Sequence, residues 1–310
     1  MNITSGLLLA ALAVGCFGSS RAQTVDDDML FARHELVSGL AYSSDRWDEY
    51  WEGSLKRRNG NIGTISTQTA LWHAGFGLSE RLSLFATVPY VWTHASAGVL
   101  HDMEGFQDAT LAGKYRLLDE PFTQHGSLRA LVAVAGSVPL SDYTPDFLPL
   151  SIGTQSKRVA ARLTVSFRAT PGWFVAGSTA YTWRDNVTLD RSSYFTQNRL
   201  FLTNEVDMPN VVDWSLRAGY VRNGLQATLI HTTQRTQGGG DIRRQDMPFV
   251  SNEVNFSQLG AMVSYALPRL PALELQLAYA YALDGRNVGQ SDVVTTGFAY
   301  HFDLGESDAP

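Results

Sequence analysis

The stretch "ALELQLAYAYALD", residues 272–284, alternates large apolar side chains with small or polar ones from end to end. Successive side chains of a β-strand point to opposite faces, so the stretch predicts a strand with two different surfaces. One face carries Leu273, Leu275, Leu277, Tyr279, Tyr281 and Leu283. The other face carries Glu274, Gln276, Ala278, Ala280, Ala282 and Asp284. A strand of this length and pattern is typical of a membrane-spanning β-barrel, in which one face contacts lipid and the other faces the lumen.

The same alternation recurs in about twelve segments of the 310-residue chain. Their approximate ranges are 36–51, 62–76, 82–95, 106–118, 127–138, 158–169, 173–186, 209–221, 225–237, 254–267, 272–284 and 291–303. Strands of soluble β-sandwiches are usually about five or six residues long, so a jelly roll or a large sandwich is the weaker alternative. We therefore predict an all-β fold: an antiparallel transmembrane β-barrel of about 12 strands over residues 36–303.

The connections between these segments alternate in length. Short ones such as "DEPFTQHG", "TPG", "RNG" and "PRLP" carry the Gly, Pro and Asn residues that tight turns require. Longer ones span 52–61, 96–105, 139–157, 187–209, 238–253 and, more modestly, 286–290. Short periplasmic turns and longer extracellular loops are typical of outer-membrane barrels. An even number of strands then puts both chain ends on the periplasmic side.

The composition restricts the function. Charged residues make up only 17% of the chain and the net charge is −6, which disfavours a nucleic-acid partner because such a partner requires a basic face. Apolar residues make up 44%, yet no run approaches the roughly 18–20 residues of a membrane-spanning helix. The chain is thus poor in charge for a soluble protein and is expected to cross the membrane with strands.

The N-terminus predicts export. Residues 1–22 read as a signal peptide, with an apolar stretch "GLLLAALAVGCFG" and small residues at Ser20 and Ala22 before the expected cleavage site. The alternative is lipidation of Cys16, the only cysteine of the chain. Residues 23–35 are then a periplasmic N-terminal segment, in which "TVDDDML" reads as a disordered linker, and 304–310 a periplasmic C-terminal tail.

The last predicted strand, "DVVTTGFAYHFD", has an aromatic face and a small, polar face. Thr295, Gly297, Tyr300 and Phe302 resemble the C-terminal signal by which the barrel assembly machinery recognises its outer-membrane clients. In most clients the final aromatic residue ends the chain, whereas here "DLGESDAP" follows. We expect the aromatic side chains to face lipid at the membrane interface.

Two neighbouring stretches, "GLSERLSLFATVPYVW" and "GFQDATLAGKYRLL", resemble the core of a bacterial outer-membrane family named for the MetA pathway of phenol degradation. The matching positions are Gly77, Arg81, Pro89, Tyr90, Gly105, Asp108, Lys114, Tyr115 and Arg116. Gln107 stands where the family pattern has a second Gly. The resemblance implies an outer-membrane barrel that takes up small molecules, with hydrophobic or aromatic compounds as candidates.

Charged and polar residues on the lumen-facing side of the predicted strands are the candidate pore lining, because such residues set pore selectivity. They are Asp108, Lys114, Arg116, Arg129, Arg162, Arg168, Asp213, Arg217, Glu274 and Gln276, with Arg158 at the same parity. The alternative is that Arg–Asp pairs brace a narrow barrel shut, since twelve strands are close to the size that side chains can fill. The sequence leaves the two open.

Enzyme sites are disfavoured, and we predict no cofactor, no metal site and no catalytic residue. His34 and Glu35 lack the second His of a zinc pair and are expected to be solvated. Outer-membrane phospholipases carry His-x-Ser near the outer rim, and His94 and Ser96, with Gln107 on the next strand, are the candidates for such a site. The Asn that this arrangement requires is missing.

The sequence therefore predicts a monomeric channel of the bacterial outer membrane that passes small molecules without an enzymatic step. Its expected partners are membrane lipid and lipopolysaccharide, the barrel assembly machinery and the solute, with no nucleic acid. The alternatives are a phospholipase-type barrel enzyme and a closed structural or adhesin barrel.

Overall fold

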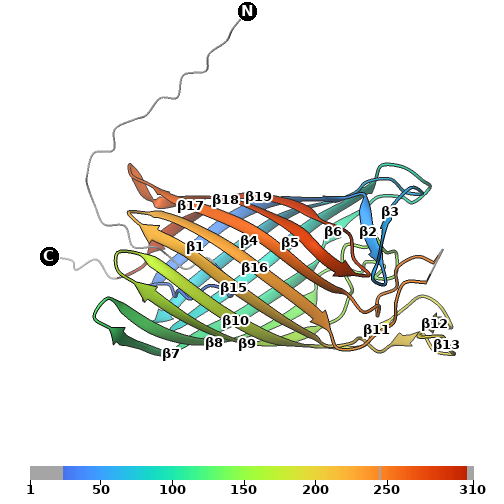
Figure 1. Ribbon diagram of the computed structural model, residues 1–310, viewed down its shortest axis with the longest axis horizontal. Helices are drawn as coiled ribbons and strands as arrows, with labels where there is room; N and C mark the ends of the chain where they lie inside the picture. The colour runs from blue at the N-terminus through green and yellow to red at the C-terminus, as the bar shows by residue number, and fades with distance from the viewer. Residues whose placement is uncertain (1–23, 244–245, 306–310) are drawn as a thin grey trace, which may run out of the picture.

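The computed structural model describes residues 24–243 and 246–305, and it forms a closed antiparallel barrel (Figure 1). Twelve strands of 12 to 17 residues make the wall. They are β1 (Glu35–Trp47), β4 (Ile65–Ser79), β5 (Leu82–Ala95), β7 (Asp108–Thr123), β8 (Gly126–Pro139), β9 (Arg158–Ala169), β10 (Trp173–Arg184), β15 (Val211–Arg222), β16 (Leu225–Thr236), β17 (Asn255–Leu267), β18 (Leu270–Arg286) and β19 (Asp292–Asp303). The predicted all-β, twelve-stranded fold is confirmed.

Each long strand pairs with its neighbours in the chain, and β1 pairs with β19 to close the barrel. That seam runs from Glu35↔Asp303 to Arg46↔Asp292, so the closure is continuous. Closure leaves the wall without a free edge, and every strand can satisfy its backbone hydrogen bonds inside a membrane. Among the described residues, none belongs to a helix that is long and apolar enough to cross a membrane.

Short turns lie at one end of the barrel and long loops at the other (Figure 1). The loop end also carries shorter strands: β2 (Glu49–Glu52), β3 (Leu55–Arg58), β6 (Met103–Phe106), β11 (Val187–Thr188), β12 (Tyr194–Thr196), β13 (Arg199–Phe201) and β14 (Glu205–Val206). One connection differs from expectation. The predicted turn "DEPFTQHG" is largely strand, because β7 runs on to Thr123 through two register shifts before it turns into β8.

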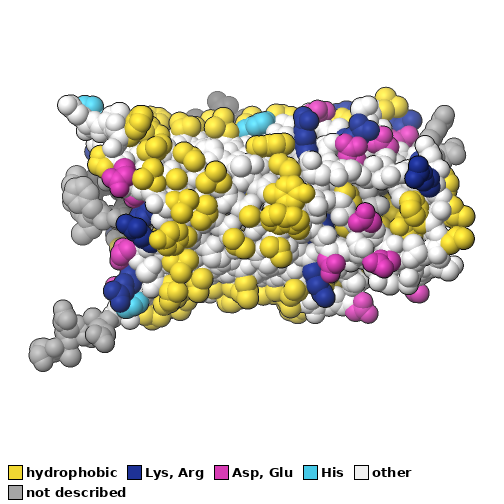
Figure 2. All heavy atoms as spheres, turned by 90° about the horizontal axis from the view of Figure 1, so that it is seen from below, with side chains coloured by type: hydrophobic (Ala, Val, Ile, Leu, Met, Phe, Trp, Pro, Cys, Tyr) yellow, Lys and Arg dark blue, Asp and Glu magenta, His cyan; other side chains and the backbone are white. Residues whose placement is uncertain are grey.

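The wall has the two faces that the alternation predicts. On β18 the Leu277 side chain is 58% exposed, whereas Glu274 is 4% exposed and points into the barrel. Hydrophobic side chains cover the middle of the barrel, and charged side chains gather toward its two ends (Figure 2). This is the surface that a hydrocarbon layer with polar interfaces on both sides requires.

Outward-facing aromatic side chains pair near both ends of the wall. At the short-turn end, Tyr300 and Phe302 have ring centroids 4.7 Å apart, and Trp173 and Tyr220 are 4.9 Å apart. At the loop end, the pairs are Tyr90–Trp92 at 4.7 Å and Tyr181–Trp183 at 4.8 Å. These two belts lie where membrane interfaces favour amphipathic rings.

The residues that precede β1 do not form the predicted disordered linker. Asp27, Asp28, Met29 and Phe31 are all less than 7% exposed and pack against inward-facing side chains of the wall. The interpretation of "TVDDDML" as a linker is therefore wrong, and residues 24–31 lie inside the barrel. The predicted signal peptide and most of the predicted C-terminal tail lie outside the described residues.

The two faces of β18 predict opposite effects for neighbouring substitutions. Leu277→Arg places a charge on the lipid-facing side near mid-strand, which should cost about 2–4 kcal/mol of stability. Gln276→Arg adds a charge to the lumen and should leave stability close to wild type. Urea unfolding of each variant in liposomes measures the difference, and equal losses in both would contradict the assignment of faces.

Candidate functional site

Asp28 occupies a carboxylate-binding site on the inner wall. Arg168 of β9 donates through Nε and Nη2 to the two Asp28 carboxylate oxygens, both at 2.6 Å. The Ser166 hydroxyl, two residues away on the same face, donates to Asp28 Oδ2 at 2.6 Å. Three donors converge on one carboxylate, and two of them come from the same guanidinium, which makes the arrangement strong and specific in orientation.

Asp27 pairs with a second inward-facing cation. Lys114 of β7 is 1% exposed, and its Nζ lies 2.8 Å from Asp27 Oδ1 and 2.7 Å from the Thr24 carbonyl oxygen. A buried ammonium is costly unless it is paired and its protons are accepted. The acidic segment supplies those acceptors, so Lys114 and Asp27 depend on each other for burial.

Asp26 contacts two further cations of the wall. Arg162 Nε lies 3.1 Å from Asp26 Oδ1, and Arg217 Nη2 lies 3.6 Å from Asp26 Oδ2. Arg162 also contacts the wall carboxylate of Asp213, with Nη2 2.8 Å from Oδ1. Across this cluster, four cations of β7, β9 and β15 meet four carboxylates, of which three belong to the N-terminal segment.

The apolar half of the segment follows directly after these acids. Met29 and Phe31 pack with Val37, Phe85, Ala112 and Ala299, all on the inner face. The Phe31 and Phe85 ring centroids are 5.1 Å apart, and the Phe31 amide donates to the Ser83 hydroxyl at 3.0 Å. The Phe31 ring lies against Gly75 of β4, where a Cβ would overlap it. The missing side chain at Gly75 therefore makes room for the segment.

A second group of titratable side chains lies at the β1–β19 seam. His301 Nδ1 lies 2.9 Å from Glu35 Oε1, and His301 Nε2 lies 3.7 Å from Glu274 Oε2. Glu35 also accepts a hydrogen bond of 2.8 Å from the Ala32 amide. The expectation that Glu35 is a solvated residue is wrong, since its side chain is only 13% exposed and fixes the start of β1. Glu35 of β1 and Glu274 of β18 thus lie together at the seam, whereas the cations that meet the N-terminal segment lie on β7, β9 and β15.

The loop of residues 140–157 folds into the barrel at the opposite end. The Tyr143 hydroxyl donates to Asp108 Oδ1 at 2.6 Å, and Asp108 also pairs with Arg158. The Thr93 hydroxyl donates to the carbonyl oxygen of Leu150 at 2.6 Å, and Leu150 is fully buried. Burial and the hydrogen bond to Asp108 raise the pKa of Tyr143, so its hydroxyl stays a neutral donor. The lumen is thus occupied at both ends, by the N-terminal segment and by this loop.

All the residues proposed from the sequence as pore lining lie on inward-facing positions of the wall. Arg116 and Arg129 form a separate group at the short-turn end, where both contact Asp119, at 3.2 and 3.1 Å. Of the C-terminal residues, Tyr300 and Phe302 point outward, and Gly297 lies at inward parity between Ala41 and Gln276. Asp26, Asp27, Asp28 and Tyr143 were not among the site residues predicted from the sequence. The sequence did contain one indication of this role for the acidic residues: three consecutive acids precede the first strand, and the lumen-facing side of the strands carries more Arg and Lys than Asp and Glu.

The residues of the phospholipase alternative are not brought together. His94 Nδ1 contacts Asp102 at 2.8 Å, while the Ser96 hydroxyl accepts a hydrogen bond from the Thr64 amide at 2.8 Å. The Gln107 amide donates to the Ile152 carbonyl in the barrel mouth. Within the described ranges, no group of three or more His, Cys, Asp or Glu residues is arranged to hold a metal ion.

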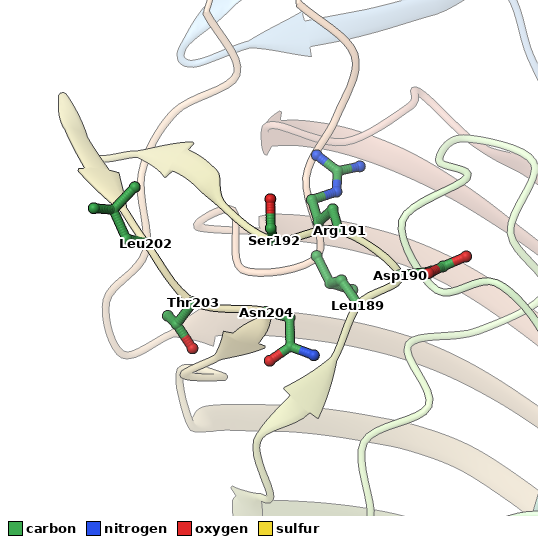
Figure 3. A pocket seen from close by; sticks show the side chains of 7 residues that line it. All are labelled: Leu189, Asp190, Arg191, Ser192, Leu202, Thr203 and Asn204. Carbon is green, nitrogen blue, oxygen red and sulfur yellow. The ribbon is translucent and has the colours of Figure 1, made fainter.

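An open hollow lies on the loops between β10 and β15, away from the inner wall (Figure 3). Its lining comprises Leu189, Asp190, Arg191, Ser192, Leu202, Thr203 and Asn204. Asp190 and Leu202 point to opposite sides of it, and Arg191 already pairs with Asp146. The hollow therefore offers no convergent set of groups, and the inner wall is the better candidate site.

Known proteins resemble this chain in sequence pattern and in fold. The sequence pattern of the family described as "Putative MetA-pathway of phenol degradation" matches residues 62–298. Comparison with curated proteins found no match. Among solved structures, an outer membrane channel from Pseudomonas putida F1 superposes with a TM-score of 0.69 at 14% identity, over 89% of this chain and 98% of that chain.

Two other barrels superpose more loosely. The translocator domain of the autotransporter NalP from Neisseria meningitidis has a TM-score of 0.45 at 11% identity, over 86% of this chain and 88% of that chain. A mutant of the monoaromatic hydrocarbon channel TodX has a TM-score of 0.40 at 11% identity, over 89% and 92%.

The contact between Phe31 and Gly75 gives a direct test of the occupied lumen. Gly75→Leu should expel Phe31, because overpacking a filled site costs about 1–3 kcal/mol, and the single-channel conductance should rise. Gly136→Leu is the matched control, since Gly136 faces outward with open space around it. A conductance unchanged in both variants would show that residues 24–34 do not limit the passage.

Proposed function

Because the chain belongs to the MetA-pathway phenol-degradation family, we propose that it is a bacterial outer-membrane channel for the passive uptake of small molecules. The observation that carries the proposal is the closed barrel with a lipid-compatible outside and charged side chains along its inside. Buried charges are costly in a low-dielectric interior, so the many charged side chains on the inner wall favour a function for the lumen over a purely structural barrel.

The inner charges are proposed to act on the solute. When the acidic segment is displaced, the cations of β7, β9 and β15 face Glu35 of β1 and Glu274 of β18, and the two groups impose an electric field across the lumen. Such opposed walls orient dipolar and charged solutes and set ionic selectivity. We therefore propose that the inward-facing residues named from the sequence line the pore. The acidic segment neutralises the cations among them.

Passage through this lumen requires the N-terminal segment to shift. Its side chains fill the space between the basic wall and the seam, so a solute of more than a few atoms competes with them for room. Hydrophobic and aromatic compounds are candidate solutes, because Met29 and Phe31 occupy an apolar pocket of the inner wall.

The protein is proposed to act as a monomer without enzymatic activity, inserted by the barrel assembly machinery through Thr295, Gly297, Tyr300 and Phe302. Tyr300 and Phe302 lie on the outer face of the closing strand, where a partner can contact them before closure. We also propose that a cleaved signal peptide directs export of the protein and that its outer surface contacts lipopolysaccharide.

Single-channel recording in planar bilayers tests the function. We expect discrete ionic conductance steps from the wild-type protein, with larger steps from Gly75→Leu. No steps from either protein would contradict a channel and favour a closed structural barrel. Phospholipid turnover by the pure protein that is lost in His94→Ala would instead favour the enzyme, whereas a channel leaves the lipid intact.

A further inference from the structure

We propose that the site occupied by Asp28 is a solute site for an amphipathic carboxylate, and that the N-terminal segment is its built-in competitor. The inference rests on the proposed channel function and names the class of solute. An amphipathic carboxylate here means a carboxylate attached to an apolar or aromatic body.

The donor set selects a planar carboxylate. Arg168 presents two parallel N–H donors to the two oxygens of Asp28, and Ser166 adds a third donor to one of them. Ser166 is 1% exposed, so this donor is fixed by packing. A guanidinium fork matches the geometry of a carboxylate, which an alcohol or an amide of the same size cannot reproduce.

The apolar pocket lies within reach of this carboxylate site. Phe31 follows Asp28 by three residues, so the two positions are separated by at most about 10 Å of extended chain. The Phe31 ring contacts Phe85 and Gly75 on the inner wall. A solute with a carboxylate at one end and a ring at the other reproduces both contacts of the segment.

The charge balance of the wall requires an anion when the segment leaves. Lys114, Arg162, Arg168 and Arg217 would then face only the wall carboxylate of Asp213. Unpaired buried cations are strongly unfavourable, so departure of the segment is favoured only when another anion takes its place. A neutral solute does not compensate the charge of these cations. We therefore predict that the site selects carboxylates over neutral solutes of the same shape.

The probes are 3-phenylpropanoate and its neutral analogue 3-phenylpropanol, titrated calorimetrically into the detergent-solubilised full chain. We expect 3-phenylpropanoate to bind and 3-phenylpropanol not to bind detectably. Asp28→Asn weakens the internal competitor, so it should lower the Kd of the carboxylate by about tenfold. Arg168→Gln should abolish binding, also when combined with Asp28→Asn.

The control variant is Arg235→Gln, which removes an exposed, outward-facing guanidinium of β16 and should bind like wild type. Heat-modifiable migration on gels reports that each barrel is folded. Equal affinity for acid and alcohol, or an unchanged Kd in Asp28→Asn, would overturn the proposal. If conductance persists while the acid fails to bind, the solute class is wrong and the channel function stands.

Discussion

The contact between the carboxylates of Asp26, Asp27 and Asp28 and the cations of the inner wall is the interaction on which the interior depends. Lys114 is 1% exposed, and the guanidinium of Arg168 also lies inside the barrel. Both cations require a carboxylate beside them, because an unpaired charge in the interior is unfavourable. The segment that supplies these carboxylates also brings Met29 and Phe31 into the lumen. One stretch of about ten residues therefore neutralises the cations of the wall and places apolar side chains inside the barrel.

The wall itself could be predicted from the sequence because its pattern is local. Alternation in stretches such as 272–284 identifies each strand and each of its faces without knowledge of the neighbouring strands. The inward positions of Lys114, Arg162, Arg168 and Asp213 follow from that parity alone. Boundaries were less certain where a strand continues through unfavourable residues, as β7 does at Pro121.

The contents of the lumen could not be predicted in the same way, because they depend on contacts between distant residues. Asp27 and Lys114 are 87 positions apart, and Asp28 and Arg168 are 140 apart. A run of three acids has the composition of a linker, and only the excess of cations on the opposing wall distinguishes it from one. The inward course of the loop at Tyr143 likewise depends on a remote partner, Asp108.

The acidic segment is expected to stay bound to the basic wall when the barrel lies in the membrane. A double-mutant cycle on urea unfolding in liposomes, with Lys114→Met, Asp27→Asn and the double variant, measures this most directly. We expect a favourable coupling of about 0.5–3 kcal/mol between the two positions, because their charges are buried together. Additive effects, with no coupling, would contradict it.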